Sequence, residues 1–135
     1  MTPKLTLRST QRLKRNNDFI RVRKTGRSYR CPYFALFSAI RSENEPTLPS
    51  ARIGISASIR VGNAVTRNRL KRSFRELFRL RQHQIRPEAD IVISIRYPAQ
   101  KASRSDLERR FEQAVRYNGL LRPSAPGQAE APTTT

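Results

Sequence analysis

Basic side chains crowd the segment from Arg60 to Arg81, which contains eight basic residues and a single acid, Glu76. Guanidinium groups hold phosphate oxygens bidentately and also stack on bases. One polar row recurs at positions i, i+4, i+7 and i+11, the spacing of one helix face: Asn68, Arg72, Arg75 and Arg79. This spacing predicts a row of cations that binds the phosphate backbone of a nucleic acid.

A helix from about Ala64 to Gln82 is expected to position that row. The side chain of Asn63 can cap its first turn, and Pro87 prevents a longer continuation. An apolar stripe at i, i+4, i+7 and i+8 predicts the buried side of the helix: Leu70, Phe74, Leu77 and Phe78. Lys71 falls between the two stripes. Residues 67–69 lie in the first turn, where free backbone N–H groups and the helix dipole favour phosphate.

Catalysis by the protein itself is not predicted. His83 is the only histidine, and it lies among arginines near the expected end of the helix. The acids are scattered along the chain, whereas a metal nuclease gathers its carboxylates around the ion. The sequence has no Cys/His metal spacing and no glycine-rich phosphate loop. We therefore expect no catalytic residue and no metal site in the protein.

The composition indicates the same kind of partner. Lys and Arg total 28 against 10 Asp and Glu, a formal net charge of +18, and arginines outnumber lysines 23 to 5. Such a charge favours a polyanionic partner, with nucleic acid before an anionic membrane surface. A genome rich in G and C would account for part of the arginine excess but not for the net charge. A single cysteine, Cys31, fits a cytoplasmic protein, and no apolar run approaches the roughly 20 residues of a membrane span.

Two further helices are predicted, one near each end of the folded part. The first covers residues 19–25 and the last follows Pro98. Their expected boundaries combine polar N-terminal caps with C-terminal glycines. These boundary residues are Asn17 or Asp18 and Gly26 for the first helix, and Ser103 or Ser105 and Gly119 for the last.

Apolar segments predict strands at residues 33–40, 52–59 and 89–96. In the second segment, alternation places one set of side chains on a buried face: Ile53, Ile55, Ala57 and Ile59. In the first, Tyr33 and Phe37 are expected to share a face. With Phe19 they either form a surface for stacked bases or belong to the core. The succession of strand, arginine-rich helix and strand is a βαβ unit if the strands are parallel, and the general chirality rule predicts a right-handed crossover.

The chain is therefore expected to form one α+β domain between two extensions. Residues 1–16 form a basic N-terminal arm and residues 17–121 the domain. Residues 42–50 form a polar loop with two prolines, and residues 122–135, rich in Pro, Ala and Thr, form a disordered tail.

Residues 61–79, VGNAVTRNRLKRSFRELFR, resemble the signature of the ribonuclease P protein family, in which a basic RNR motif lies within G-N-A-V-x-R-N-R-x-K-R. The match is nearly complete from Gly62 to Arg72. The family's neighbouring elements are resembled, in order, by LKRNNDF (13–19), RIGISAS (52–58) and ADIVISIR (89–96). The likeness spans roughly residues 10–117.

The resemblance implies an α/β sandwich, with a sheet of about four strands packed against three helices. It also implies that the βαβ crossover is left-handed, against the general rule. It implies the protein subunit of a ribonucleoprotein that removes the 5′ leader from precursor tRNA. In that enzyme the RNA subunit, with Mg²⁺, performs the hydrolysis, and one protein per catalytic RNA and no membrane partner are expected.

The residues and the resemblance together define two candidate site groups. The expected RNA-binding residues are Arg60, Asn63, Arg67, Asn68, Arg69, Lys71, Arg72, Arg75 and Arg79. The expected residues of the leader cleft are Phe19, Arg23, Tyr33, Phe37 and Ser56. Two positions depart from the family's pattern. Arg23 stands where many members have a second aromatic residue, and Ile59 stands where they often have a basic one.

Two other functions are compatible with the basic helix. One is a structural or assembly protein bound to another RNA, such as ribosomal RNA, against which the RNR segment argues. The other is a DNA-binding protein that places the helix in a major groove, for which no dimerisation or helix-turn-helix signal is present. Competition between duplex DNA and precursor tRNA would separate DNA binding from the two RNA-binding functions, the ribonuclease P subunit and the structural protein.

Overall fold

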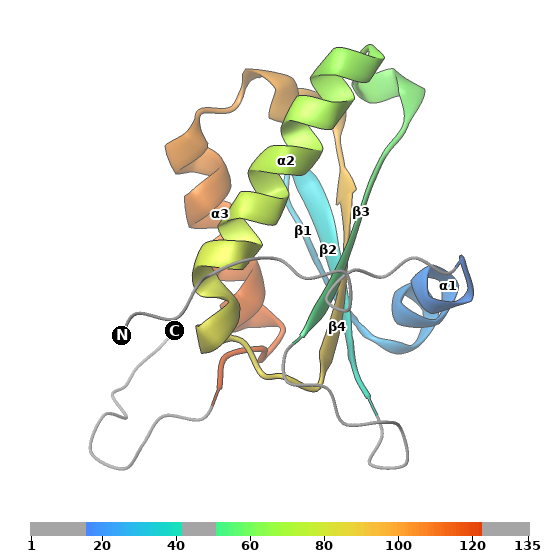
Figure 1. Cartoon of the computed structure of the whole chain (residues 1–135), viewed down its shortest axis with the longest axis vertical. Coiled ribbons are helices and arrows are strands. Elements are labelled where there is room, and N and C mark those ends of the chain that lie inside the picture. The colour runs from blue at the N-terminus through green and yellow to red at the C-terminus, as the bar shows by residue number, and fades with distance from the viewer. Residues whose placement is uncertain (1–15, 42–50, 123–135) are drawn as a thin grey trace.

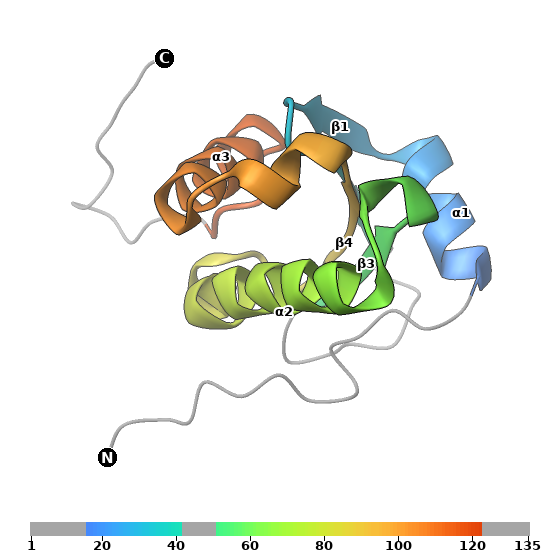
Figure 2. The same cartoon turned by 90° about the horizontal axis from the view of Figure 1, so that it is seen from above.

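The computed structural model describes residues 16–41 and 51–122, which form a mixed four-stranded sheet with helices on both faces (Figures 1 and 2). The strands are β1 (Arg27–Arg30), β2 (Phe34–Ile40), β3 (Arg52–Ala57) and β4 (Ala89–Ile95). Their order in the sheet is β1-β2-β4-β3. Strand β2 is antiparallel to both of its neighbours, and β3 is parallel to β4.

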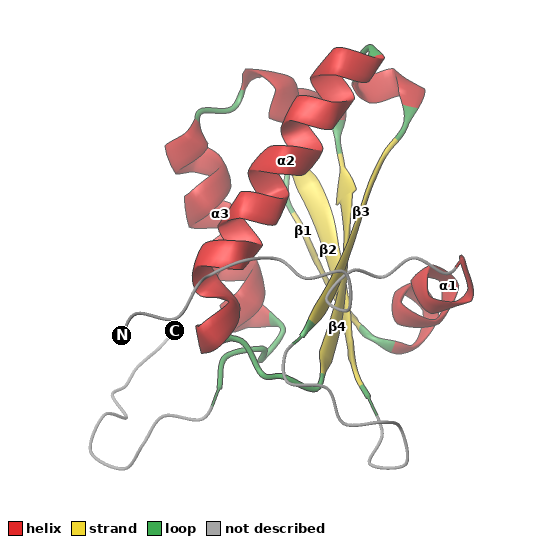
Figure 3. Cartoon of the chain, viewed as in Figure 1, coloured by secondary structure: helices red, strands yellow, loops and turns green. Residues whose placement is uncertain are grey.

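Three α-helices cover the sheet, as the pattern predicted. They are α1 (Asn16–Thr25), α2 (Ala64–Arg81) and α3 (Arg104–Tyr117). Helices α2 and α3 lie side by side on one face, and α1 lies on the other (Figure 2). The 3-10 turns η2 (Ile59–Val61), η3 (Gln82–Gln84) and η4 (Tyr97–Lys101) connect these elements (Figure 3). The predicted α+β class is confirmed.

The main core lies between the sheet and the pair α2 and α3. The Phe34 ring meets the Phe74 ring edge to face, with centroids 5.2 Å apart. Strand β4 contributes buried side chains to both faces, as predicted for a doubly covered strand, and its Val92 belongs to a smaller cluster under α1. Because β3 and β4 are parallel and α2 connects them, the predicted βαβ unit is present. The left-handed sense of its crossover stays a prediction.

The helix boundaries confirm some expectations and correct others. Ser103 caps α3 by accepting a hydrogen bond from the Asp106 backbone N–H at 3.1 Å, and Gly119, with φ of 69°, follows the helix in the left-handed conformation. Helix α1 begins at Asn16, so the predicted capping residues Asn17 and Asp18 lie inside its first turn.

Gly26 follows α1 as predicted, but for a different reason. It has no positive φ, and a Cβ at this position would lie 1.6 Å from the Ser38 backbone oxygen. A glycine is required here because β2 passes so close to the end of α1.

One strand was missed, and one predicted strand was too long at its end. Strand β1 was not predicted, because its sequence RSYR is polar and mostly exposed at a sheet edge. Strand β3 ends at Ala57, so Ile59 falls in the turn η2, where it is 81% exposed rather than buried. Apart from Asn16 and Arg122, the predicted arm, polar loop and tail lie outside the described residues. Within residues 16–41 and 51–122, no helix is long and apolar enough to cross a membrane.

Candidate nucleic-acid interface

Helix α2 is anchored at its first turn and along its apolar side. The Asn63 side-chain oxygen accepts a hydrogen bond from the Thr66 backbone N–H at 2.8 Å, which confirms the predicted cap. All members of the predicted apolar stripe are buried against the sheet: Leu70, Phe74, Leu77 and Phe78. The orientation of the helix about its own axis is therefore fixed, and its polar side chains are directed away from the core.

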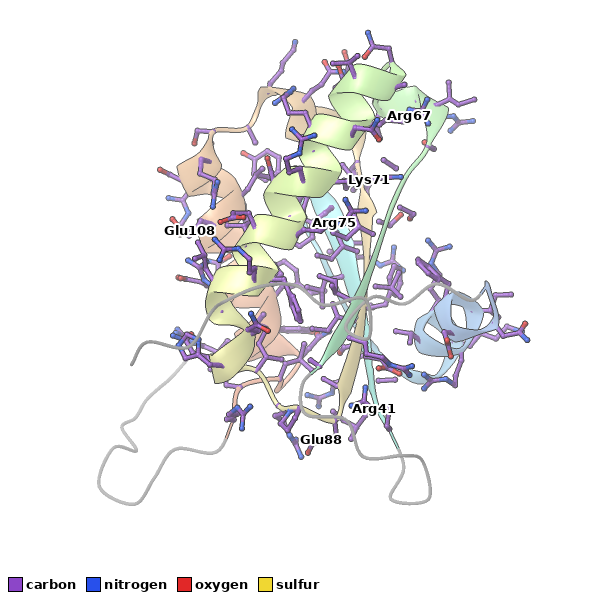
Figure 4. The ribbon with its side chains drawn as sticks, in the orientation of Figure 1. Arg41, Arg67, Lys71, Arg75, Glu88 and Glu108 are labelled. Carbon is purple, nitrogen blue, oxygen red and sulfur yellow. The ribbon has the colours of Figure 1, made fainter. Side chains whose placement is uncertain are left out.

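One cationic row on α2 faces the neighbouring strand β3. Arg67, Lys71 and Arg75 follow one another at single-turn spacing along that side of the helix (Figure 4). All three are half-buried, and the Arg67 guanidinium donates a hydrogen bond to the Gly62 carbonyl at 3.2 Å. Arg75 belongs both to this row and to the predicted stripe that begins at Asn68, whereas Asn68 and Arg72 of that stripe are exposed.

A second set of polar residues on and before α2 is exposed to solvent. Its members are Arg60, Asn63, Asn68, Arg69 and Arg72. Near the end of the helix, Arg79 forms an ion pair with Glu76. The hydrogen bond from Arg79 lowers the pKa of the Glu76 carboxyl, so the pair is charged at neutral pH. Arg79 is thus a predicted RNA-binding residue that the protein engages with one of its own carboxylates.

A cleft of about 410 Å³ lies where α1, β3 and α2 meet. The residues that line it are Phe19, Ile20, Arg23, Ile55, Ser56, Ala57 and Lys71. It brings together three residues that were predicted for the leader cleft, Phe19, Arg23 and Ser56, with Lys71 of the RNR segment. The two predicted groups therefore meet at Lys71.

Close packing fixes the wall of this cleft that α1 provides. The Phe19 ring lies directly on the backbone of β3, because a Cβ at Gly54 would come within 2.5 Å of its Cζ atom. One turn later, the Arg23 guanidinium donates a hydrogen bond to the Ser56 hydroxyl oxygen at 3.2 Å. Both contacts join α1 to β3 across the cleft.

Phe37 and Tyr33 do not share a surface, contrary to the prediction. Phe37 is half-buried on the α1 face with Phe19 and Val22. Tyr33 precedes β2 in a turn, and its ring packs against the main core on the side of α2 and α3. The strict alternation assumed for residues 33–40 fails at Tyr33 because the strand begins only at Phe34.

Two charged residues with notable contacts were not predicted. Arg30, on the unpredicted strand β1, places its guanidinium 5.4 Å from the Phe37 ring centroid. Asp90 is fully buried, and its carboxylate binds guanidinium groups from three elements or loops: Arg21 at 2.5 Å, Arg41 at 2.6 Å and Arg52 at 2.8 Å. Only Asp90's place at the start of a strand was visible in the sequence.

Among the residues that the structure describes, ion pairs engage all of the carboxylates but only some of the cations. In the described part of the chain, every Asp and Glu forms an ion pair with an arginine: Asp18, Glu76, Glu88, Asp90, Asp106, Glu108 and Glu112. By contrast, several site cations form no ion pair within these same residues: Arg23, Arg30, Arg60, Arg67, Arg69, Lys71 and Arg72. Among residues 16–41 and 51–122, no group of three or more His, Cys, Asp or Glu side chains could hold a metal ion. The surface is built for an external polyanion.

The fold and this surface define an α+β protein of the nucleic-acid-binding class, with a cationic crossover helix beside a cleft. A family model described as Ribonuclease P matches residues 7–118. The chain therefore belongs to the ribonuclease P protein family.

Individual relatives agree with this assignment. The ribonuclease P protein component of Shouchella clausii is 36% identical over 117 residues, covering 87% of this chain and 93% of the relative. That of Desulforapulum autotrophicum is 37% identical over 114 residues, covering 82% and 93%. The RNase P protein structures of Staphylococcus aureus and Thermotoga maritima superpose with TM-scores of 0.71 and 0.65 at 29% and 26% identity. They cover 83% and 76% of this chain, and 98% and 92% of their own.

Proposed function

We propose that this chain is the protein subunit of a ribonuclease P ribonucleoprotein that removes the 5′ leader from precursor tRNA. One observation supports this assignment above the others. The described carboxylates are all neutralised by arginines, while the cations from Arg60 to Arg72 have no intramolecular ion pair in the described residues. An RNA would supply the missing negative charge, and the cytoplasm is the compartment that fits tRNA processing.

In this proposal the two parts of the surface have separate tasks. The exposed cations at the start of α2 bind the phosphate backbone of the catalytic RNA, where the helix N-terminus adds its positive dipole. The cleft beside β3 binds the single-stranded leader. Lys71 lines that cleft and also belongs to the RNR segment. It would therefore hold the leader close to the RNA that cleaves it, so that binding orients the scissile bond.

Mg²⁺ belongs to the RNA subunit in this proposal. A hard divalent cation prefers carboxylate and other oxygen ligands. The described carboxylates are each occupied by an arginine, and Asp90 is held by three of them. The protein's own residues would instead bind, orient and neutralise phosphates around a metal that the RNA holds.

The first test is cleavage with and without RNA. We expect the purified protein alone to leave precursor tRNA intact. Protein plus a bacterial ribonuclease P RNA should release the leader at a lower Mg²⁺ concentration than the RNA alone requires. Cleavage by the protein alone would contradict the proposal that the RNA subunit performs the hydrolysis. Selective co-purification with ribosomal RNA would favour the alternative of a structural or assembly protein.

The second test separates motif contacts from diffuse charge. Arg67→Ala or Arg69→Ala should reduce the salt slope of RNA binding by roughly 0.7–0.9, the value for one lost phosphate contact. Lys101→Ala removes an exposed charge outside the motif and serves as the control. Arg79→Ala should also change the slope less, because Glu76 already neutralises Arg79. Equal slopes for all four variants would mean that overall charge, rather than the RNR segment, drives binding.

A further inference from the structure

Two guanidinium groups lie over the Phe37 ring on the α1 face of the sheet. The Cζ atom of Arg23 is 5.7 Å from the ring centroid, and that of Arg30 is 5.4 Å away. Both distances are within the roughly 6 Å of a cation–π interaction. The two arginines come from different elements, the last turn of α1 and the edge strand β1, and they converge on one aromatic ring of β2.

The strand register explains why Arg30 reaches this position. Ser28 is paired directly with Phe37, and Arg30 is paired with Ala35, two residues along the same face of the sheet. A long side chain at that diagonal position extends over the aromatic ring. Tyr29, the residue between Ser28 and Arg30 in β1, has its side chain on the other face of the sheet, where it packs against the main core. The position of Arg30 therefore follows from the register.

The charges at this place are not balanced within the described protein. Neither Arg23 nor Arg30 forms an ion pair with residues 16–41 or 51–122, and the described polar partner of Arg23 is the neutral Ser56 hydroxyl. Two cations beside one ring repel each other, and an anion between them would relieve that repulsion. The guanidinium groups also cover the ring, so a base could stack on Phe37 only after displacing them.

We propose that Arg23 and Arg30 form a phosphate subsite for single-stranded RNA, with Phe37 as the platform that holds the two guanidinium groups. The subsite binds one phosphodiester of the leader as the strand leaves the cleft that Arg23 also lines. It rests on the proposed function and refines it. At this position the chain recognises the RNA backbone, so leader binding there is independent of base identity and sensitive to salt.

The test uses the protein reconstituted with a bacterial ribonuclease P RNA. Arg30→Gln should weaken binding of leader-bearing precursor tRNA about threefold at low salt, the size of one exposed charge contact. Its salt slope should be shallower by roughly 0.7, the single-strand value for one phosphate. Binding of mature tRNA should be unchanged. Arg116→Gln removes the same charge from an exposed position on α3 and should affect neither substrate.

Chemically altered leaders locate the contact. A neutral methylphosphonate placed at successive linkages should weaken wild-type binding at one linkage and have a smaller effect there with Arg30→Gln, in which Arg23 is the remaining contact. Arg30→Lys should retain most of the affinity, because it keeps the charge. Abasic substitutions in the leader should cost the same for the wild type and for Arg30→Gln. If abasic substitutions weaken binding to the wild type but not to Arg30→Gln, the site stacks a base, and the phosphate subsite is wrong.

This result is separable from the proposed function. If the wild-type chain with RNA removes the leader but Arg30→Gln behaves as Arg116→Gln does, the subsite is wrong and the function stands. If the wild-type chain fails to support leader removal, the proposed function itself is wrong. Thermal melts of both variants check that neither change has altered folding.

Discussion

Asp90 is the buried charge around which one end of the sheet is organised. It accepts hydrogen bonds from Arg21 of α1, from Arg41 after β2 and from Arg52 of β3. Burial, the largest influence, raises the pKa of the Asp90 carboxyl, but the hydrogen bonds from Arg52 and Arg21, with the charges of Arg52 and Arg41, outweigh burial and lower it. The carboxylate thus stays ionised, and it ties α1 to two strands.

Asp90→Asn should destabilise the protein by about 3–5 kcal/mol, because it removes the buried negative charge that binds Arg21, Arg41 and Arg52. Since the folded-state pKa is lowered, the stabilisation by Asp90 is fully present above the unfolded-state value of about 3.9 and is lost as the pH falls through the folded-state pKa. Urea unfolding of both proteins between pH 7 and pH 3 measures this. The free-energy difference between them should shrink toward low pH. A difference that does not change with pH would contradict the charged role.

Little of this residue-level detail could be predicted from the sequence. The partners of Asp90 are 38 to 69 positions away, so no local pattern links them. Tyr33 was assigned to the wrong surface because one residue of strand boundary decides which face a side chain occupies. By contrast, the Asn63 and Ser103 caps depend on neighbours three positions away. The Asn63 cap was predicted, and Ser103 was one of the two predicted candidates for the other.

At the level of elements, α2 was predictable and β1 was not. The helix carries a complete apolar stripe, a polar cap and a motif of known resemblance, and its bounds were correct to one residue. Strand β1 is short, polar and exposed, so nothing but its pairing with β2 marks it as a strand. Arg30 was missed for this reason, whereas Arg23 was found because it stands where members of the resembled family often have a second aromatic residue.

The docking of α1 on β3 depends on the absence of a side chain at Gly54. Alanine normally suits a strand better than glycine, yet Gly54→Ala should destabilise the protein by about 1–3 kcal/mol, because its Cβ would overlap the Phe19 ring. Chemical denaturation gives the cost. Leader binding should weaken in the same variant as Phe19 moves in the cleft.

A double-mutant cycle provides the control for this packing argument. In a Phe19→Ala background the overlapping ring is gone, so Gly54→Ala should become close to neutral or stabilising. If Gly54→Ala costs the same in both backgrounds, then contact with Phe19 is not the reason that β3 requires glycine at this position.

For the whole molecule, the net charge of +18 gives salt two opposite effects. Added salt screens repulsion within the free protein, so its melting temperature should rise between about 0.01 and 0.2 M ionic strength, as the Debye length falls from about 30 Å to below 10 Å. Salt should weaken RNA binding over the same range. The melting temperature of the protein–RNA complex should therefore fall toward that of the free protein. Melts of both samples in parallel check this.

If the melting temperatures of the free protein and of the complex change in the same direction with salt, that expectation is wrong. A free protein that loses stability with added salt would mean that its intramolecular ion pairs outweigh the repulsion among its unmatched cations. The net charge follows directly from the composition, but the sequence did not reveal that the described acids are all engaged inside the protein. That distribution follows from tertiary contacts such as those of Arg81 on α2 with Glu108 and Glu112 on α3.

Strand β3 lies at an edge of the sheet, so one side of its backbone has no partner strand within the described chain. Such edges invite pairing with a second molecule, and charged neighbours discourage it. Lys71 and Arg23 flank this edge in the cleft. We therefore expect the cations that would bind RNA also to discourage edge-to-edge self-association while no RNA is bound. Substitutions that neutralise Lys71 or Arg23 should therefore also promote self-association, which light scattering of the free protein would detect.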